Sequence, residues 1–465
     1  MADKSMQWLV TIAIVGCGSS TPPDQRELVD LTGVSPEFRP TATTISELIG
    51  LSYQLPDQTA PEATVVSPFA LSALRQAGVR HARADLLWNL VEPTPGVRDF
   101  STYRAKVEAY ASAGVTTLPI LAYGNAWANA TQEWTTTPPD DPADYAAFAG
   151  AASTQFRGTI PTYEIWNEPN LGFRFWQPRE QPDEYGTLLA TASASIRAAD
   201  PEASVMLGGL IEHGQLNKDA ETFLELVYRS HPDIAKAYDV LAFHPYPLYP
   251  PAVAPELDDE ASGEVATPRM VARLRALLAY YGDDPARPIW ATELGWPTYG
   301  VVDEERQARW LVRGALLLAG SGVEKMYWYT LFDGPNATTF PPEDAFGLFH
   351  YDDPSDGSFA PTPKLAFTAL STLLSVAGPL AVTTDVTSEL VGAPADAHAY
   401  RLVDPTGATP PVTVVWRADD AAPPIMVTVP VTRPSIRVVD LLGVELPASA
   451  TIPLSGRPVY VVELP

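Results

Sequence analysis

The stretch TYEIWNEPNLGFRFW, residues 162–176, decides how the rest of the chain is interpreted. Its first half, TYEIWN, is rich in β-branched and aromatic residues, which favour a strand. Asn167 and Glu168 follow at the end of that run, directly before Pro169. Strand stability gives no reason for an adjacent amide and carboxylate, so we interpret them as polar groups placed at a strand end for chemistry.

The same alternation of strand and helix continues on both sides of this stretch. Short β-branched or aromatic runs are followed by Ala/Leu-rich stretches with helical periodicity, and Gly78, Gly114 and Gly282 fit helix ends. Eight such units over about 330 residues predict an α/β fold, a (β/α)8 TIM barrel, although the alternation alone would also allow a doubly wound sheet. The predicted strands are 48–54, 80–86, 116–123, 161–167, 204–211, 239–246, 288–294 and 325–332. The predicted helices are 66–77, 101–114, 142–157, 182–199, 219–230, 267–281, 303–321 and 363–377.

The C-terminal part of the chain differs from the rest in amino-acid composition and in periodicity. From about residue 380, Val, Thr and Pro dominate and helical periodicity disappears. AYRLVD, PVTVVWRA, IMVTVPV, SIRVVDL and PVYVVEL predict at least five short strands with turns between them. We therefore expect a catalytic barrel over 44–378 and a C-terminal β-sandwich domain over 379–465.

The N-terminus has the features of an export signal. Lys4 precedes an apolar run over 8–15, and Cys17, the one cysteine of the chain, follows it. This order is that of a bacterial lipoprotein signal, with residues 1–16 removed and Cys17 as the lipidation site, although a frayed terminus with a chance cysteine is the alternative. Residues 17–43 would then form a flexible tether. We expect an exported lipoprotein, periplasmic or at the cell surface and otherwise secreted, which meets the membrane only through this anchor.

The bulk composition limits the partners. The chain has 465 residues and a formal net charge of −26 at pH 7. That charge argues against nucleic acid or an anionic membrane surface as the main partner and favours a neutral or cationic ligand, although it also serves solubility alone.

Reactive side chains lie at the ends of several predicted strands. Glu168 ends the fourth strand and Glu293 the seventh, while His244 and Tyr246 end the sixth and Arg83 lies in the second. The C-terminal ends of the strands meet at one mouth of a TIM barrel. Two carboxylates facing each other across such a mouth are the arrangement that glycosidases use around the scissile bond.

The chain resembles the clan A retaining glycoside hydrolases, most closely family 39, with family 5 as the nearest competitor. Five stretches carry the resemblance, and they fall in order on the second, fourth, sixth, seventh and eighth predicted strands. They are RADLLWNLVEPTPGVRDF (83–100), YEIWNEPN (163–170), AFHPYP (242–247), WATELGWP (290–297) and MYWYTLFD (326–333). The resemblance implies a retaining β-glycoside hydrolase that cleaves a β-linked oligo- or polysaccharide and needs no cofactor.

The resemblance also assigns roles to particular positions. Glu168 matches the general acid/base and Glu293 the nucleophile, and their carboxyl groups are expected to lie ~5–5.5 Å apart. Five further positions match substrate-binding or supporting groups: Asn167 for the sugar 2-hydroxyl, Arg83 and Tyr246 beside the nucleophile, Trp328 as the floor of the −1 subsite, and His244 as a polar group lining it. We expect Glu164 to be a structural partner of Arg83 or Arg80 rather than a catalyst.

Elementary chemistry supports the same roles. A nucleophilic carboxylate must stay ionised and needs donors nearby, whereas the acid must stay protonated and needs burial. Trp176 and Trp296 fall in strand-end loops, where aromatic faces can stack on sugar rings, and are predicted to bind substrate. The first predicted strand has no His-x-His pair, so we expect no metal.

The runner-up interpretation is a non-catalytic carbohydrate-binding lipoprotein on a degenerate glycosidase barrel. The sequence leaves the sugar, the linkage and endo or exo action open, because loops after the strands decide them.

Overall fold

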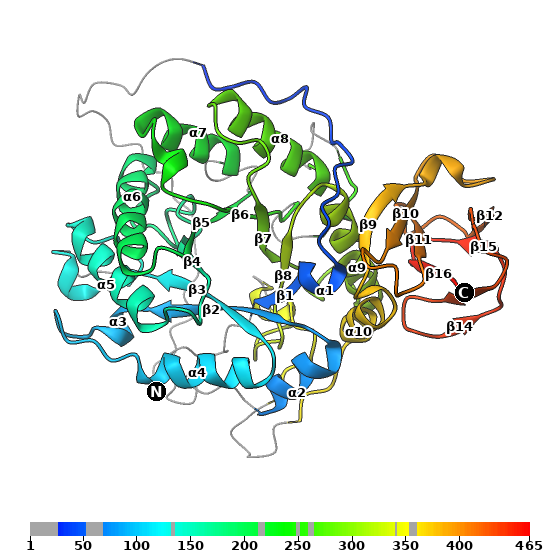
Figure 1. Cartoon of the computed structure of the whole chain (residues 1–465), viewed down its shortest axis with the longest axis horizontal. Helices are drawn as coiled ribbons and strands as arrows, with labels where there is room; N and C mark the ends of the chain where they lie inside the picture. The colour runs from blue at the N-terminus through cyan, green and yellow to red at the C-terminus, as the bar shows by residue number, and fades with distance from the viewer. Residues whose placement is uncertain are drawn as a thin grey trace.

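The computed structural model describes residues 27–52, 68–131, 135–212, 219–247, 252–258, 265–339, 342–352 and 360–465. They form a barrel surrounded by helices and a smaller β-domain beside it (Figure 1). The predicted signal peptide and Cys17 lie outside the described residues.

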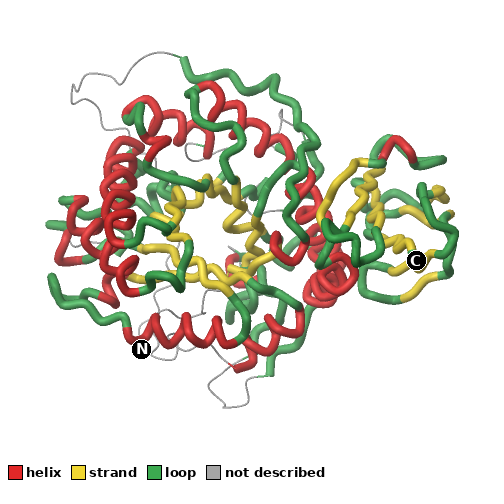
Figure 2. The backbone as a smooth tube through the Cα atoms, in the orientation of Figure 1, coloured by secondary structure: helices red, strands yellow, loops and turns green. Residues whose placement is uncertain are grey.

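Eight parallel strands close into a barrel in sequence order, which confirms the predicted fold. The ring of strands is seen along the barrel axis in Figure 2. The strands are β1 (Ile49–Ser52), β2 (His81–Leu87), β3 (Thr116–Ala122), β4 (Thr162–Asn167), β5 (Ser204–Ile211), β6 (Leu241–His244), β7 (Ile289–Leu294) and β8 (Lys325–Tyr329).

Helices surround the ring of strands on the outside (Figure 2). They are α1 (Ile45–Leu48), α2 (Pro68–Ala77), α3 (Trp88–Val91), α4 (Ser101–Ser112), α5 (Pro142–Gln155), α6 (Pro182–Ala199), α7 (Ala220–Ser230), α8 (Thr267–Tyr280), α9 (Glu304–Gly320) and α10 (Leu365–Ala377). α5 and α9 each begin with an aspartate as a side-chain cap. Asp141 accepts from the Ala143 N–H ahead of Pro142, and Asp303 accepts from the Arg306 N–H.

Two strands, β6 and β8, are shorter than the sequence predicts by more than one residue within the described ranges. β6 ends at His244 because Pro245 has no N–H to donate to a neighbouring strand. β8 ends at Tyr329, after which the chain leaves the barrel and Phe332 forms a bridge with Phe349.

The barrel interior has its own small apolar cluster, apart from the main core between strands and helices. It consists of Leu118, Met206, Val240, Ala242 and Tyr327. Because the cluster joins Leu118 of β3 to Tyr327 of β8, and these strands are not neighbours in the barrel, the cluster spans its interior. The barrel is therefore a packed core and leaves its rim for function.

The β-domain is a sandwich of unequal sheets. Six antiparallel strands run in the order β14-β13-β16-β11-β10-β9, and β12 pairs with β15. One face of the larger sheet joins the barrel core and the other packs toward the smaller sheet. The strands are β9 (Ala381–Asp385), β10 (Ala397–Val403), β11 (Val412–Arg417), β12 (Ile425–Thr428), β13 (Ile436–Val439), β14 (Glu445–Leu446), β15 (Thr451–Leu454) and β16 (Val459–Glu463).

A buried polar network fastens this domain to the barrel. Arg313 of α9 has no exposed surface and pairs with Glu256, from the loop after β6, at 2.5 Å. Its other arm pairs with Asp420 of the β-domain at 2.7 Å. Trp416 donates to Glu256 at 2.7 Å and Trp310 to Asp420 at 2.6 Å. The two carboxylates thus share one guanidinium, and each also accepts a hydrogen bond from an indole.

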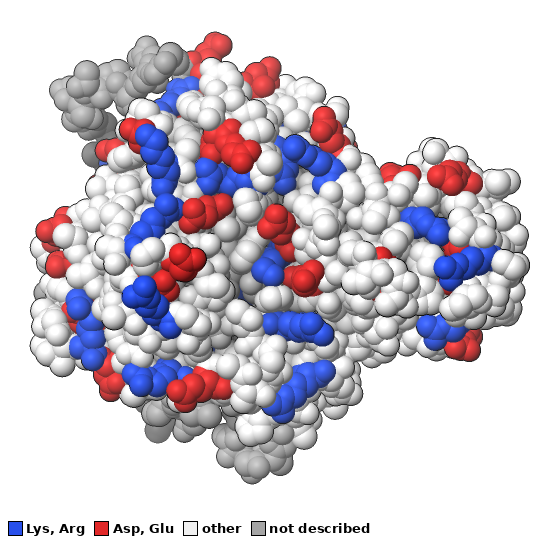
Figure 3. All heavy atoms as spheres, in the orientation of Figure 1, with Lys and Arg blue, Asp and Glu red and all other residues white. Residues whose placement is uncertain are grey.

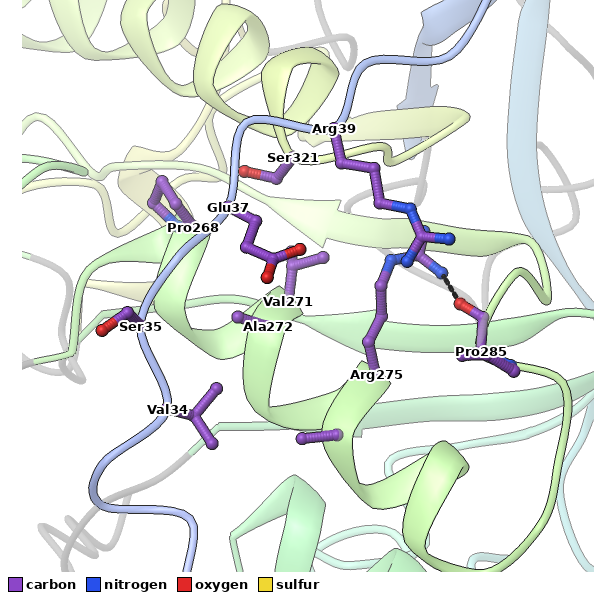
Figure 4. A pocket seen from close by; sticks show the side chains of 11 residues that line it. Val34, Ser35, Glu37, Arg39, Pro268, Val271, Ala272, Arg275, Pro285 and Ser321 are labelled. Carbon is purple, nitrogen blue, oxygen red and sulfur yellow. Dashed lines mark hydrogen bonds between the residues drawn. The ribbon is translucent and has the colours of Figure 1, made fainter.

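Residues 27–43 run along the outside of the barrel helices. The Val29 N–H donates to Glu225 on α7, and Arg269 on α8 donates to the Val34 carbonyl. Figure 4 shows this segment passing over α8, with a cavity of about 210 Å³ between them. The guanidinium groups of Arg39 and Arg275 lie side by side at one end of that cavity.

Two surface properties complete the description. On the face shown in Figure 3, acidic and basic side chains are interspersed and neither sign gathers into one patch. Across the described ranges, no helix combines the length and the apolarity that crossing a bilayer requires.

Candidate active site

The polar residues picked from the sequence meet at the C-terminal ends of the strands. Asn167 and His244 are the last residues of β4 and β6, and Glu168 follows β4 directly. Glu293 lies one residue before the end of β7. Glu168 and Glu293 are only 4 % and 6 % exposed, so each carboxyl is largely shielded from bulk water.

Glu168 and Glu293 face each other closely. One carboxylate oxygen of each and one ring nitrogen of His244 all lie within 4.8 Å of one another. An oxygen–oxygen separation within 4.8 Å fits a retaining pair of carboxyl groups, at ~5–5.5 Å, better than an inverting pair, at ~6.5–9.5 Å.

Arg83 organises the Glu293 side of the site. Its Nη1 donates to Glu293 at 2.6 Å, and its Nη2 donates to the Asn167 side-chain oxygen at 2.8 Å. Nε and Nη2 also form a bidentate pair with Glu164, at 2.7 and 2.9 Å. Glu164 thereby fixes the guanidinium in place. The Tyr246 hydroxyl donates to the second Glu293 oxygen at 3.2 Å, so both oxygens have donors.

A chain of hydrogen bonds fixes the proton on Glu168. The Thr292 hydroxyl donates to Glu164 at 3.3 Å, so its oxygen is left to accept from His244 Nε2 at 3.0 Å. A neutral imidazole with its proton on Nε2 has a bare Nδ1. That Nδ1 lies 2.7 Å from Glu168 and must accept, so Glu168 carries the proton.

The pKa directions agree with this assignment. Burial raises the pKa of Glu168 to about 7. The charge of Arg174 lowers this pKa by a smaller amount, and the charge of Glu343 raises it. Burial lowers the pKa of His244 to about 4, so the imidazole is neutral in the ordinary range of pH. Burial also raises the pKa of Glu293, but the charged Arg83 guanidinium, which donates to this carboxylate, opposes that rise. The two carboxylates therefore have unlike surroundings, as an acid and a nucleophile require.

The backbone at the end of β4 is strained where Glu168 is presented. Trp166 and Glu168 have φ of 71° and 45°, which non-glycine residues adopt at a cost of order 1–3 kcal/mol. The Glu168 N–H donates to the Gly209 carbonyl at 3.0 Å. A Cβ at Gly209 would lie 2.1 Å from His244 Nε2, so only glycine admits the imidazole here.

The predicted aromatic platforms do not all line the site. Trp176 is 1 % exposed, between Trp166 and Tyr185, and Trp296 is 0 % exposed, against Trp310 and Trp328. Their faces are covered by protein, which corrects the expectation that they stack on substrate. Trp328 is also buried, beneath the rim on β8.

Three residues at the mouth were not singled out from the sequence. Thr292 gave no signal beyond preceding Glu293, and its role depends on His244 and Glu164 arriving beside it. Arg174, within the stretch 162–176, pairs with Glu343 at 2.9 Å. Their charges reach Glu168, as the pKa of that carboxyl shows.

The trio of Glu168, His244 and Glu293 also has donors that a divalent cation uses. Arg83 already supplies a full positive charge at Glu293, at 2.6 Å. A second cation there would be repelled by the guanidinium, so the residues present suit a neutral ligand better than a metal.

Comparison with known structures supports the fold. No family model matches the sequence, and no curated protein matches it. A family 39 glycoside hydrolase from the gut symbiont Bacteroides cellulosilyticus WH2 matches with a TM-score of 0.70 and 20 % identity, over 94 % of this chain and 82 % of that one. A family 39 β-xylosidase from Caulobacter crescentus matches with a TM-score of 0.60 and 16 % identity, over 93 % of this chain and 99 % of that one.

A family 30 endoxylanase from Clostridium papyrosolvens C71 matches with a TM-score of 0.56 and 14 % identity, over 93 % of this chain and 100 % of that one. Family 5, the expected competitor, is the weaker structural match. The chain therefore shares the fold of these solved glycoside hydrolases, a barrel with a β-domain beside it.

Proposed function

We propose that the protein is a retaining β-glycoside hydrolase that works through a glycosyl-enzyme intermediate. The observation that carries this proposal is the pair of buried carboxyl groups that have one oxygen each within 4.8 Å of the other. Glu293 is bound to a guanidinium, and Glu168 is bound to a neutral imidazole. Double displacement at an anomeric carbon requires one ionised carboxylate as the nucleophile and one protonated carboxyl group as the acid. The family 39 and family 30 structures of similar fold are glycoside hydrolases, which supports the class of reaction.

In the first step, Glu293 attacks the anomeric carbon while Glu168 gives its proton to the leaving oxygen. Arg83 and Tyr246 hold Glu293 ionised and aimed. The C–O bond to the leaving group breaks as the bond to the Glu293 oxygen forms. Until that moment the proton stays on Glu168, because the unprotonated Nδ1 of His244 accepts a hydrogen bond from the Glu168 carboxyl group.

In the second step, Glu168 is the base. It takes a proton from a water that attacks the same carbon, and the ester to Glu293 breaks. The proton returns to Glu168 and restores the starting state. Asn167, which accepts from Arg83 at the end of β4, is proposed to bind the hydroxyl next to the reacting carbon.

The substrate is proposed to be a β-linked oligo- or polysaccharide. The folds of a β-xylosidase and an endoxylanase match this one, so β-xylosides come first in a panel that includes glucosides and mannosides. Activity on this panel separates a hydrolase from a non-catalytic carbohydrate-binding protein.

Replacing Glu293 by alanine tests the proposal. We expect turnover to fall by at least ~10⁴-fold, with azide restoring cleavage and giving the glycosyl azide of inverted configuration. Glu47→Ala, on the far side of the barrel at α1, is the matched control and should keep its rate. Normal activity in Glu293→Ala would overturn the assignment of the nucleophile.

We further propose that the chain is exported and anchored by lipid at Cys17. This rests on the sequence of residues 1–17, which lie outside the described part of the structure. Cys17→Ser should abolish incorporation of labelled fatty acid into the chain, and incorporation unchanged in that variant would refute the anchor.

A further inference from the structure

An ion pair joins two loops on opposite sides of the barrel mouth. Arg174 lies in the loop between β4 and α6, and Glu343 begins the short helix η4 (Glu343–Ala345), between β8 and α10. Arg174 Nη1 lies 2.9 Å from Glu343 Oε1. In a closed barrel of eight strands in sequence order, β4 and β8 are diametrically opposite. The pair therefore spans the mouth instead of bridging neighbouring loops.

The pair lies close to the catalytic groups. The charge of Arg174 lowers the pKa of Glu168 and that of Glu343 raises it. The charge of Glu343 also reaches Tyr246, which contacts the proposed nucleophile. Because both charges act on Glu168, which is proposed to protonate the leaving oxygen, the pair lies within electrostatic reach of the proposed leaving group.

Both ends of the pair are held by their own loops. The Arg174 guanidinium lies 4.8 Å from the centre of the Phe175 ring, which stacks on Tyr123. At the other end, Asp344 accepts from the Asn336 N–H at 2.9 Å, and the Gly334 N–H donates to its carbonyl at 2.8 Å. The side chains of Arg174 and Glu343 are 46 % and 29 % exposed, so a ligand can reach both.

We propose that the Arg174–Glu343 pair forms a bar, a bridge of two side chains across the barrel mouth, and that this bar determines whether terminal or internal linkages are cleaved. It admits the end of a sugar chain and hinders a chain that extends beyond the active site in both directions. This inference rests on the proposed glycosidase function. A terminal sugar reaches Glu168 and Glu293 from one side of the bar, whereas an internal linkage requires the polysaccharide to displace it. The bar thus favours cleavage at chain ends.

An exposed ion pair is worth at most about 1 kcal/mol, so the expected effect is about fivefold. The readout is the ratio of internal to terminal cleavage in one reducing-end-labelled β-linked pentasaccharide, of the linkage that the wild-type enzyme hydrolyses. Because both events occur on one substrate with one catalytic pair, changes in the strength of Glu168 as an acid cancel in this ratio.

Charge reversal and charge exchange make the test specific. Arg174→Glu places two carboxylates opposite each other and should raise internal cleavage about fivefold. The double variant Arg174→Glu/Glu343→Arg re-forms the pair with opposite polarity and should restore the wild-type ratio. Arg437→Glu breaks a similarly exposed pair in the β-domain, with Glu445 at 3.6 Å, and should change nothing.

Three results would overturn the bar: frequent internal cleavage by the wild-type enzyme, an unchanged ratio in Arg174→Glu, or a double variant that behaves like Arg174→Glu. The last result would mean that the ratio of internal to terminal cleavage depends on the charge at position 174 alone, and not on the ion pair. Failure of the glycosidase proposal looks different, because the wild-type enzyme would then cleave no glycoside of the panel.

Discussion

Replacing Thr292 by valine should move the alkaline limb of the pH–rate profile to lower pH. Thr292 is the acceptor that keeps the His244 proton on Nε2, because its own hydroxyl donates to Glu164. Valine has nearly the same shape but no oxygen. Without that acceptor, His244 is free to carry its proton on Nδ1 and to donate it to an ionised Glu168.

The size of the change follows from the hydrogen bond that is lost. A neutral hydrogen bond contributes about 1 kcal/mol, which in wild type favours the form in which Glu168 holds the proton. Since 1.36 kcal/mol corresponds to one pKa unit, the pKa of Glu168 should fall by roughly 0.7 in the variant. Its starting value is about 7, raised mainly by burial. The protonated form starts the reaction, so kcat/KM declines as pH rises through this pKa, and the decline should come earlier.

The assay is kcat/KM against pH for a phenyl β-glycoside, whose poor leaving group needs the proton from Glu168. Thr292→Ser is the matched control, because it keeps the hydroxyl and should keep the wild-type profile. An alkaline limb that stays in place in Thr292→Val, or that moves equally in Thr292→Ser, would refute the proton chain through His244.

Further predictions concern the acid, the interface and the absence of a metal requirement. Glu168→Ala should lower kcat/KM for a phenyl glycoside by ~10²–10⁴-fold and change the first step with a dinitrophenyl glycoside little, and equal losses on both would contradict its role as acid. Asp420→Ala should lower the free energy of unfolding by about 2 kcal/mol in a denaturant titration, because Arg313 loses a buried partner. Asp419→Ala, at an exposed neighbour that accepts, among the described residues, only from the Ala421 and Ala422 N–H groups, should have a smaller effect, and equal effects would contradict the interface network. Dialysis against EDTA should leave kcat/KM unchanged, and a loss reversed by Zn²⁺ would show that a cation occupies the site despite Arg83.

The barrel was predictable because its signals are local. β-branched runs, helix caps and glycines after helices are set by residues close in sequence, and β5 and α6 begin and end where the periodicity predicts. β8 is shorter than expected because Phe332 bridges to Phe349, a contact that depends on the fold.

The site was predictable only in part, for the same reason. Glu168, Glu293 and His244 lie at strand ends, and a barrel brings all strand ends to one rim. The Arg174–Glu343 pair and the covered faces of Trp176 and Trp296 depend on loop conformation and packing instead. A spacing pattern carries no information on which face of an indole a neighbouring helix covers.

The central claim is that Glu293 forms a covalent bond to the sugar. The direct measurement is peptide mass spectrometry after incubation with the 2,4-dinitrophenyl 2-deoxy-2-fluoro-β-glycoside of the preferred sugar, in which fluorine slows the second step and lets the intermediate accumulate. We expect one fluoroglycosyl group per chain, on Glu293. A label on another residue, or no label together with an inverted hydrolysis product, would contradict the account.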